Sequence, residues 1–175
     1  MIAETLKNRE LEKKALRVLT GIAKTDIEEG RRELNYISGG FHVEETSNPS
    51  LFRRSNVRWE YGQPVAIEVY YHNAFIGAVT LAHEVGHLKT LAELGGAAAY
   101  REEKKRYEIE QCASIWALNF LAECGANRAF LVEARQLLQG CLDNYSVPGQ
   151  SRRLLNIPVE RVSISEDKLQ AVFNF

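Results

Sequence analysis

The chain has 175 residues, of which 45% are hydrophobic and 26% are charged. This composition is typical of a globular protein with one buried core, so a single domain over residues 1–175 is expected. The 22 Lys and Arg residues nearly balance the 23 Asp and Glu residues, which gives a formal net charge of -1. A global electrostatic field that recruits nucleic acid or an anionic membrane is therefore excluded, and no direct nucleic-acid binding is expected.

The N-terminal residues and the cysteines predict a cytoplasmic location. Met1–Thr5 leads directly into a charged stretch, without the apolar region of a signal peptide, and no apolar span is long enough to cross a bilayer. The cysteines, Cys112, Cys124 and Cys141, are odd in number and lack a C-x-x-C spacing. We therefore expect reduced structural thiols on helices.

Helices are expected in the N-terminal part, residues 1–38. Apolar residues recur at helical spacing over Thr5–Ala23, and a second amphipathic segment follows Thr25-Asp26. Gly39-Gly40 then interrupts the pattern. Phe41–Ser55 is expected to form a short strand followed by an irregular loop.

The next two segments predict a β-hairpin. Apolar and polar residues alternate over Val57–Tyr61 and again over Val65–Tyr71, and Gly62-Gln63-Pro64 is expected to turn the chain between them. The sheet should therefore be small and antiparallel. Its exposed edge could pair with an extended peptide.

The remainder of the chain is predicted to be mostly helical, apart from a helix-poor stretch before Ser165, which makes the fold class α+β. The expected helices are Phe75 to about Leu94, about Tyr100 to Glu123, Arg128 to Leu142, and a short terminal helix that begins after Ser165. The sheet and the helices that carry the candidate site thus fall within 41–124. The C-terminal helical part covers 126–175.

The segment His83-Glu84-Val85-Gly86-His87 has the H-E-x-x-H pattern of a zinc site. Two histidines four residues apart on a helix lie about 40° apart around its axis, so both imidazoles project from one face. Glu84 points to the side, where it can act as the catalytic base without binding the ion. This helix is otherwise apolar on nearly every side, and burying three polar groups is unfavourable unless they are paired or bind metal. The pattern predicts one Zn²⁺ per chain, bound by His83 and His87.

A catalytic zinc site needs a third protein ligand, and Glu93, Glu108 and Glu110 are the candidates. Glu93 lies ten residues after His83, a spacing that in metalloproteases requires a glycine where this chain has Thr90. Without that glycine the helix should continue, which would carry Glu93 away from the metal.

The apolar stripe of the next helix distinguishes the other two glutamates. Its centre lies about 60° from Glu110 and about 140° from Glu108, so Glu110 borders the core and Glu108 faces solvent. The small residues Ala113, Ser114 and Ala117 share the side of Glu110 and would allow two helices to approach closely. Glu110 is therefore the predicted third ligand.

Two segments resemble the ImmA/IrrE-type metallopeptidases. Thr80–Leu88 is similar to the core motif of that family, and Glu110–Ala117 resembles its E-x-x-A-N-x-F-A helix. The resemblance covers roughly Val65–Leu121 and implies a zincin-like fold with a gluzincin-like site. Ser114 replaces the Asn or Asp that would orient a ligating histidine, so its support for the site should have shorter reach. Trp116 replaces a Phe.

The family resemblance also implies a function. Its members cleave DNA-binding repressors, so this chain would be a regulatory intracellular protease with a protein or peptide substrate such as a transcriptional repressor, and without a membrane partner. Two alternatives remain. One is a zincin-fold binding or regulatory module that keeps zinc but cleaves nothing, against which the intact Glu84 argues. The other is a phage or mobile-element protein in which the metal only joins two helices.

Peptide hydrolysis also needs a hydrogen-bond donor for the oxyanion, commonly a Tyr or His from outside the motif helices. The candidates are Tyr70, Tyr71, His72 and Tyr145. The sequence favours structural or surface roles for His72 and His42. Packing roles are likewise expected for the hairpin aromatic residues Trp59, Tyr61 and Tyr71.

Overall fold

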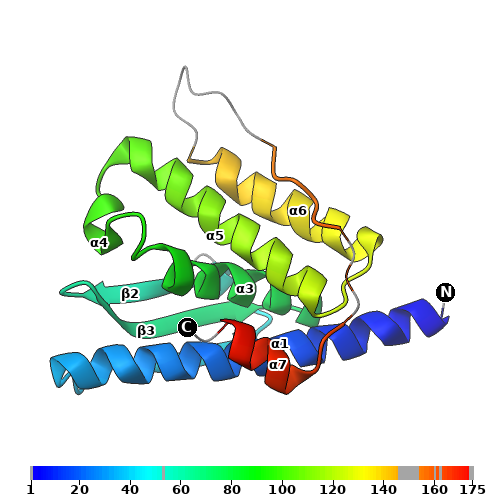
Figure 1. Ribbon diagram of the computed structural model, residues 1–175, viewed down its shortest axis with the longest axis horizontal. Coiled ribbons are helices and arrows are strands. Elements are labelled where there is room, and N and C mark those ends of the chain that lie inside the picture. The colour runs from blue at the N-terminus through cyan, green and yellow to red at the C-terminus, as the bar shows by residue number, and fades with distance from the viewer. Residues whose placement is uncertain (1, 53, 146–153, 160, 162, 174–175) are drawn as a thin grey trace.

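The computed structural model describes residues 2–52, 54–145, 154–159, 161 and 163–173. These residues form seven helices and a three-stranded sheet (Figure 1): α1 (Ile2–Leu34), β1 (Phe41–Glu45), α2 (Pro49–Phe52), β2 (Asn56–Glu60), β3 (Gln63–Tyr71), α3 (Ala74–Thr90), α4 (Gly96–Ala99), α5 (Glu103–Glu123), α6 (Arg128–Asp143) and α7 (Glu166–Phe173). The α+β class predicted from the sequence is confirmed. Parts of the predicted N-terminal and C-terminal helical regions lie outside the described residues, namely 1, 146–153, 160, 162 and 174–175.

The N-terminal part is one long helix, so the prediction of two helical segments separated at Thr25-Asp26 is wrong. Neither residue begins a new helix. The Thr25 hydroxyl donates back to the carbonyl of Gly21 at 3.1 Å, and Asp26 instead forms an ion pair with Lys89 of α3. The helix ends at Leu34, and the next residue, Asn35, adopts a φ of 51°.

The sheet is mixed, with strand order β1-β3-β2. Strands β2 and β3 form the predicted antiparallel hairpin, but its turn is Tyr61-Gly62, with φ values of 49° and 86°, and Gln63-Pro64 already belongs to β3. Strand β1 runs parallel to β3, so the prediction of a purely antiparallel sheet is wrong. The reason is topological, since β1 pairs with the far edge of β3 rather than with its neighbour in sequence. Between β1 and β2, the short helix α2 lies within the segment expected to be an irregular loop.

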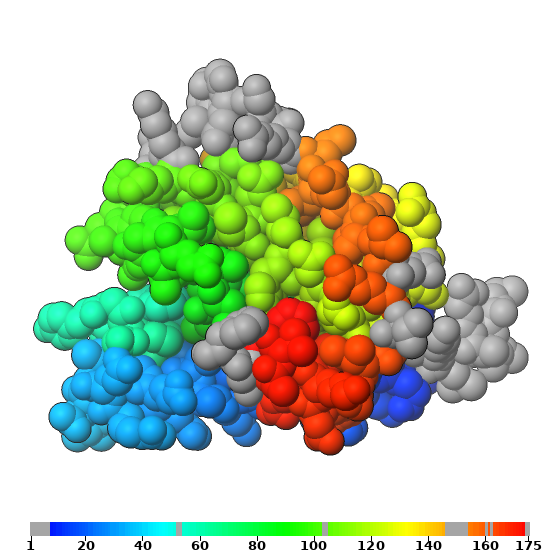
Figure 2. Space-filling model, viewed as in Figure 1, coloured from blue at the N-terminus to red at the C-terminus, as the bar shows by residue number. Residues whose placement is uncertain are grey.

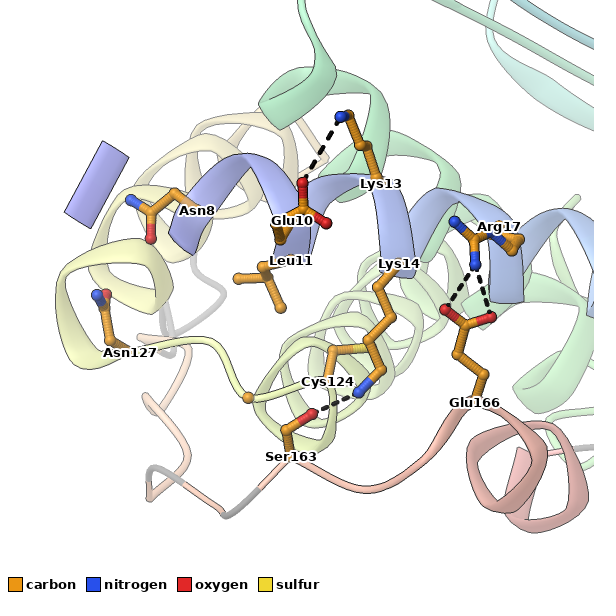
Figure 3. Close-up of a pocket in the computed structure, with 11 residues that line it drawn as sticks. Asn8, Glu10, Leu11, Lys13, Lys14, Arg17, Cys124, Asn127, Ser163 and Glu166 are labelled. Atoms are coloured by element: carbon orange, nitrogen blue, oxygen red, sulfur yellow. Dashed lines mark hydrogen bonds and ion pairs between the residues drawn. The ribbon is translucent and has the colours of Figure 1, made fainter. Parts of the chain in front are cut away.

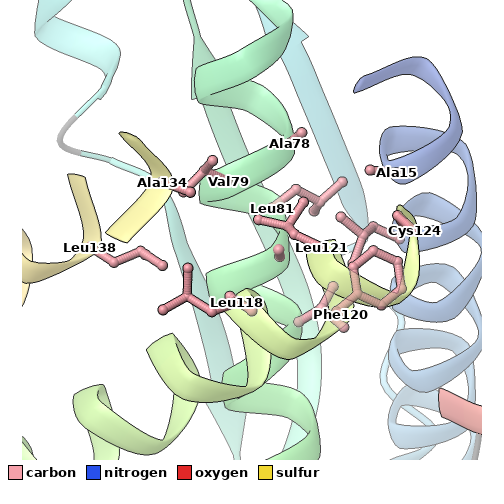
Figure 4. Packing of buried hydrophobic residues seen from close by; sticks show 14 of the residues in the cluster. Ala15, Ala78, Val79, Leu81, Leu118, Phe120, Leu121, Cys124, Ala134 and Leu138 are labelled. Carbon is pink, nitrogen blue, oxygen red and sulfur yellow. The ribbon is translucent and has the colours of Figure 1, made fainter. Parts of the chain in front are cut away.

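One face of the sheet carries the core. Ile67 and Val69 of β3 are buried against α1 and α3, which also pack against each other. Figure 4 shows the same core between helices, where Leu81 of α3 lies among Phe120 and Leu121 of α5, with Ala15 of α1 nearby. Helix α3 is therefore central to the protein, with the sheet and α1 on one side and α5 on the other (Figure 1).

Helix α3 ends at Thr90 rather than at about Leu94, and α5 begins at Glu103 rather than at about Tyr100. A turn follows α3, and Gly95 and Gly96 adopt φ values of 101° and 69°, a conformation that favours glycine. The short helix α4 then leads to Tyr100. This early break places Tyr100 in a connection between two helices.

The C-terminal segment packs along α1, as Figure 2 shows for α7. Lys14 Nζ donates to the Ser163 hydroxyl and, at 2.5 Å, to the carbonyl of Ile164, while Arg17 pairs with Glu166 at 3.0 Å (Figure 3). Leu169 of α7 is fully buried in the main core. The two ends of the chain thus stabilise each other. No helix over the described residues combines the length and apolar character needed to span a bilayer.

The ion pair between α1 and α3 predicts a stability effect. Lys89 Nζ lies 2.9 Å from Asp26 Oδ2, and the side chains are only 12% and 17% exposed. Asp26→Ala should lower the free energy of unfolding by about 2 kcal/mol, because it leaves the Lys89 charge largely buried without its partner. Denaturant unfolding of the metal-free protein measures this change.

The matched control for this effect is Glu10→Ala. Glu10 pairs with Lys13 at 3.7 Å on the surface, with side chains 78% and 66% exposed. Its loss should change the free energy of unfolding by less than about 0.5 kcal/mol. Equal effects of the two substitutions would contradict a stabilising role for the Asp26 pair.

Candidate metal centre

His83 and His87 lie one turn apart on α3 and point to a common place. Their Nε2 atoms are 3.2 Å apart, and the ring centroids are 4.7 Å apart with planes 82° to each other. Asn73 fixes the start of this helix, because its side chain accepts a hydrogen bond from the Ile76 amide at 2.9 Å. The shared face expected from the four-residue spacing is therefore present.

Glu110 joins the two histidines from α5. Its Oε2 atom lies 3.0 Å from His83 Nε2 and 3.5 Å from His87 Nε2, and the residue is only 4% exposed. The ligand atoms of these three residues all lie within 4.8 Å of one another, which is close enough to hold a metal ion. We call these residues the metal group.

The other candidate glutamates lie outside the metal group. Glu108 is exposed on α5, on the side predicted from the helical pattern. Glu93 is also exposed, but not for the reason expected from the sequence. Helix α3 has already ended at Thr90, and Glu93 lies in the turn that follows it.

Gly86 allows α3 and α5, the two helices that carry the metal group, to come together. A Cβ atom on this residue would lie 2.5 Å from the Ala113 carbonyl oxygen and 2.9 Å from Ala113 Cα on α5. The sequence identified the small residues on α5, but their partner is the glycine inside the motif itself. Because the helices touch at Gly86, the Glu110 side chain can reach both imidazoles.

Ser114 lies behind His83. Its hydroxyl oxygen is 3.3 Å from His83 Nδ1, and the residue is fully buried. An Nδ1–H group that donates to this hydroxyl leaves the Nε2 lone pair free and directed at the metal group. The serine therefore occupies the supporting place expected from the sequence.

The environment of Glu110 favours its ionised form. Burial alone would raise the pKa of this carboxyl, but hydrogen bonds with His83 and His87, and their charges, hold the pKa far below the usual 4.5. The other carboxylate oxygen, Oε1, accepts a hydrogen bond from the Tyr100 hydroxyl. The two oxygens of Glu110 thus have different partners.

Glu84 lies beside the metal group but is not part of it. The residue is 8% exposed and lines the same cleft as His83, His87 and Glu110. Burial raises the pKa of its carboxyl to about 7, with the charge of His83 acting to lower it and that of Glu110 to raise it. A carboxyl with a pKa near neutrality suits a group that both accepts and returns a proton.

Tyr100 is the site residue that the sequence did not reveal. It was expected at the start of a helix, whereas the structure places it between α4 and α5, where its hydroxyl reaches Glu110. Arg106 donates from Nε to the Tyr100 carbonyl at 2.7 Å and lies 6.0 Å from the ring centroid. The Gly95-Gly96 break was the one available signal that the chain turns before Tyr100.

A cleft of about 800 Å³ runs along α3 over the metal group. Its apolar lining comes from β2, from α3 and the chain that follows it, and from α6: Val57, Trp59, Ile76, Val79, Leu91, Ala97, Leu137 and Leu138. Apart from the metal group and Glu84, the described lining includes no Lys, Arg, Asp or Glu. Trp59, for which only packing was expected, faces this cleft.

The candidate oxyanion donors occupy different places. Tyr70, His72 and Tyr145 line the cleft, and Tyr145 lies close enough to Tyr100 to interact with it electrostatically. Tyr71 lies outside the cleft lining, with its ring packed against Gly77 on the buried face of the sheet. The surface position expected for the remaining histidine is observed, since His42 is exposed and pairs with Glu44 at 2.9 Å.

The three cysteines are free and differ in environment. Cys124 is buried, and burial raises the pKa of its thiol to about 12. Cys112 is half-buried on α5. Cys141 of α6 is exposed and lines the cleft, so its position differs from the purely structural role expected from the sequence.

No known protein family, curated protein or solved structure matches this chain. The likeness of Thr80–Leu88 and Glu110–Ala117 to the ImmA/IrrE-type metallopeptidases therefore stays a resemblance of short segments. The chemistry of the site follows from its own residues. These are two imidazoles and a carboxylate that converge, with a second buried carboxylate beside them in an apolar cleft.

Proposed function

We propose that this chain is a zinc-dependent metallopeptidase that hydrolyses peptide bonds in a protein or peptide substrate. The observation that carries the proposal is the convergence of His83 Nε2, His87 Nε2 and Glu110 Oε2, which lie 3.0 to 3.5 Å from one another. Glu84, in the same cleft, supplies the base. A metal that only joined α3 and α5 would need neither this carboxylate nor the cleft.

The spacing of the metal group fits zinc. Ligand atoms 2.0–2.1 Å from a tetrahedral Zn²⁺ lie about 3.3 Å apart, and the three separations here are 3.0, 3.2 and 3.5 Å. Three atoms with lone pairs directed at one another also need a proton or a cation between them. Two histidines and a glutamate form one of the ligand sets that hold catalytic zinc and leave the fourth position open.

The protein residues then have distinct tasks in hydrolysis. Bound zinc supplies a Lewis acid that polarises the substrate carbonyl and activates water as a nucleophile. Glu84 takes a proton from the attacking water and returns it to the leaving amine, because it lies next to the metal group without belonging to it. Ser114 holds the His83 ring through Nδ1, which fixes the direction of Nε2.

The cleft favours an extended, apolar peptide segment. Strand β2 is an edge of the sheet, and its residues Val57 and Trp59 line the cleft, so a substrate strand can pair along it through main-chain hydrogen bonds. The uncharged lining should select against charged side chains near the cleaved bond. The resemblance to the ImmA/IrrE type supports an intracellular regulatory role and a DNA-binding repressor as the substrate.

The experiment that tests this function measures metal and hydrolysis together. Protein purified without added metal should contain about one zinc per chain, as three protein ligands require. The zinc should be absent from His83→Ala and Glu110→Ala but retained in Glu108→Ala, the exposed control on the same helix. Hydrolysis of apolar peptides and of candidate repressors should stop on chelation and return with added zinc. Metal retained in Glu110→Ala, or hydrolysis that survives chelation, would contradict the proposal.

A further inference from the structure

Two tyrosines lie beside the metal group. The Tyr100 hydroxyl donates a hydrogen bond to Glu110 Oε1, and Tyr145 is close enough to Tyr100 to interact with it electrostatically. Both residues line the cleft, and they come from different parts of the chain, the α4–α5 connection and the turn that follows α6. A chain of contacts therefore runs from the cleft wall to the carboxylate of the metal group.

The protons available decide what each hydroxyl can do. An ionised carboxylate only accepts hydrogen bonds, so the contact with Glu110 requires the single proton of Tyr100. While it holds Glu110, Tyr100 has no proton left to donate to a substrate. Its contact is directed only at the carboxylate.

Helix α5 holds Tyr100 at both ends of the residue. Arg106 Nε donates to the Tyr100 carbonyl at 2.7 Å, and the guanidinium lies 6.0 Å from the ring centroid. Glu110 lies one turn after Arg106 on the same face of α5, and its carboxylate accepts the hydrogen bond from the Tyr100 hydroxyl. The Tyr100 ring also lies edge-on to His87, with centroids 6.3 Å apart. The tyrosine is thus fixed by the helix whose carboxylate it contacts.

We infer that Tyr100 is a positioning residue of the metal centre. By holding Oε1, it restricts Glu110 to binding the metal through Oε2, the oxygen that faces His83 and His87. A carboxylate without this contact can rotate or bind through both oxygens, which would occupy the position needed for water or substrate. The inference rests on the proposed function only in taking Glu110 as a metal ligand.

The test compares three variants that each remove one phenolic hydroxyl. Tyr100→Phe loses the contact with Glu110, Tyr145→Phe loses the neighbouring hydroxyl, and Tyr61→Phe alters a side chain that is 93% exposed on the hairpin turn. Zinc affinity is measured by chelator competition. The visible spectrum of the Co²⁺-substituted protein at saturating cobalt reports the coordination of the ion.

Tyr100→Phe should weaken zinc binding about 10- to 100-fold and change the cobalt spectrum, as expected for a lost contact behind a metal ligand. Tyr145→Phe should weaken binding less, and Tyr61→Phe should leave it unchanged. The thermal unfolding midpoint of each metal-free variant separates this effect from a loss of stability. An unchanged spectrum for Tyr100→Phe would overturn the positioning role, whether its affinity stayed the same or fell together with the midpoint. If the unsubstituted protein bound no zinc, the proposed function would be overturned as well.

Discussion

Gly86→Ala should abolish tight metal binding although it changes no ligand. The new Cβ would lie 2.5 Å from the Ala113 carbonyl oxygen and 2.9 Å from its Cα, and these are backbone atoms that cannot move without shifting α5. Overpacking of this kind costs about 1–3 kcal/mol of stability. The shift of α5 would also move Glu110 away from the histidines. Removing a residue that only supports a metal ligand lowers affinity by up to roughly 100-fold, and the loss of zinc affinity in Gly86→Ala should be larger than this.

Gly140→Ala is the control for Gly86→Ala. Gly140 lies inside α6, and a Cβ there would meet nothing within 4 Å. Since alanine favours the helix over glycine, this change should stabilise the protein by about 0.5–1 kcal/mol and leave zinc affinity intact. Denaturant unfolding and chelator competition measure both quantities. If Gly86→Ala lowers the free energy of unfolding and Gly140→Ala raises it, the contact between α3 and α5, and not the loss of a glycine as such, causes the destabilisation. Unchanged zinc affinity in Gly86→Ala would show that the close approach of the helices at Gly86 does not position Glu110.

The metal group could be predicted because its geometry is local or helical. The spacing of His83 and His87 fixes their common face, and the apolar stripe of α5 fixes the direction of Glu110. Neither inference needs knowledge of distant contacts. The hairpin of β2 and β3 was predictable for the same reason, since alternation and a turn are properties of adjacent residues.

The features that were missed depend on contacts between distant residues. Strand β1 is parallel to β3 because it pairs across the far edge, which no local pattern encodes. Thr25-Asp26 has the composition of a helix start, but Lys89, far along the chain, is the partner of Asp26. Tyr100 gained its role only because α3 ended early. In each case tertiary packing decided between options that the local sequence allows.

Glu84→Gln should separate catalysis from metal binding. The amide cannot accept and return a proton, so peptide hydrolysis should fall by about 10²- to 10⁴-fold, while His83, His87 and Glu110 still hold about one zinc per chain. Rates with a peptide substrate and elemental analysis of the same sample measure the two effects. Glu108, which is exposed, provides the control, because Glu108→Gln should change neither the rate of hydrolysis nor the zinc content. Hydrolysis that persists in Glu84→Gln would remove the proposed base.

Glu84→Gln should increase the stability of the folded protein although it lowers the rate of hydrolysis. Burial raises the pKa of Glu84 from 4.5 to about 7, so the folded protein binds this proton more tightly than the unfolded chain does. Stability is therefore lost as pH rises from 4.5 towards 7, and the full penalty applies above that pH. A neutral glutamine avoids this penalty, so metal-free Glu84→Gln should be more stable than the unsubstituted protein at pH 8, by up to about 3 kcal/mol. A gain in stability with a loss of activity would mark Glu84 as a residue kept for function, whereas loss of both would make it part of the core.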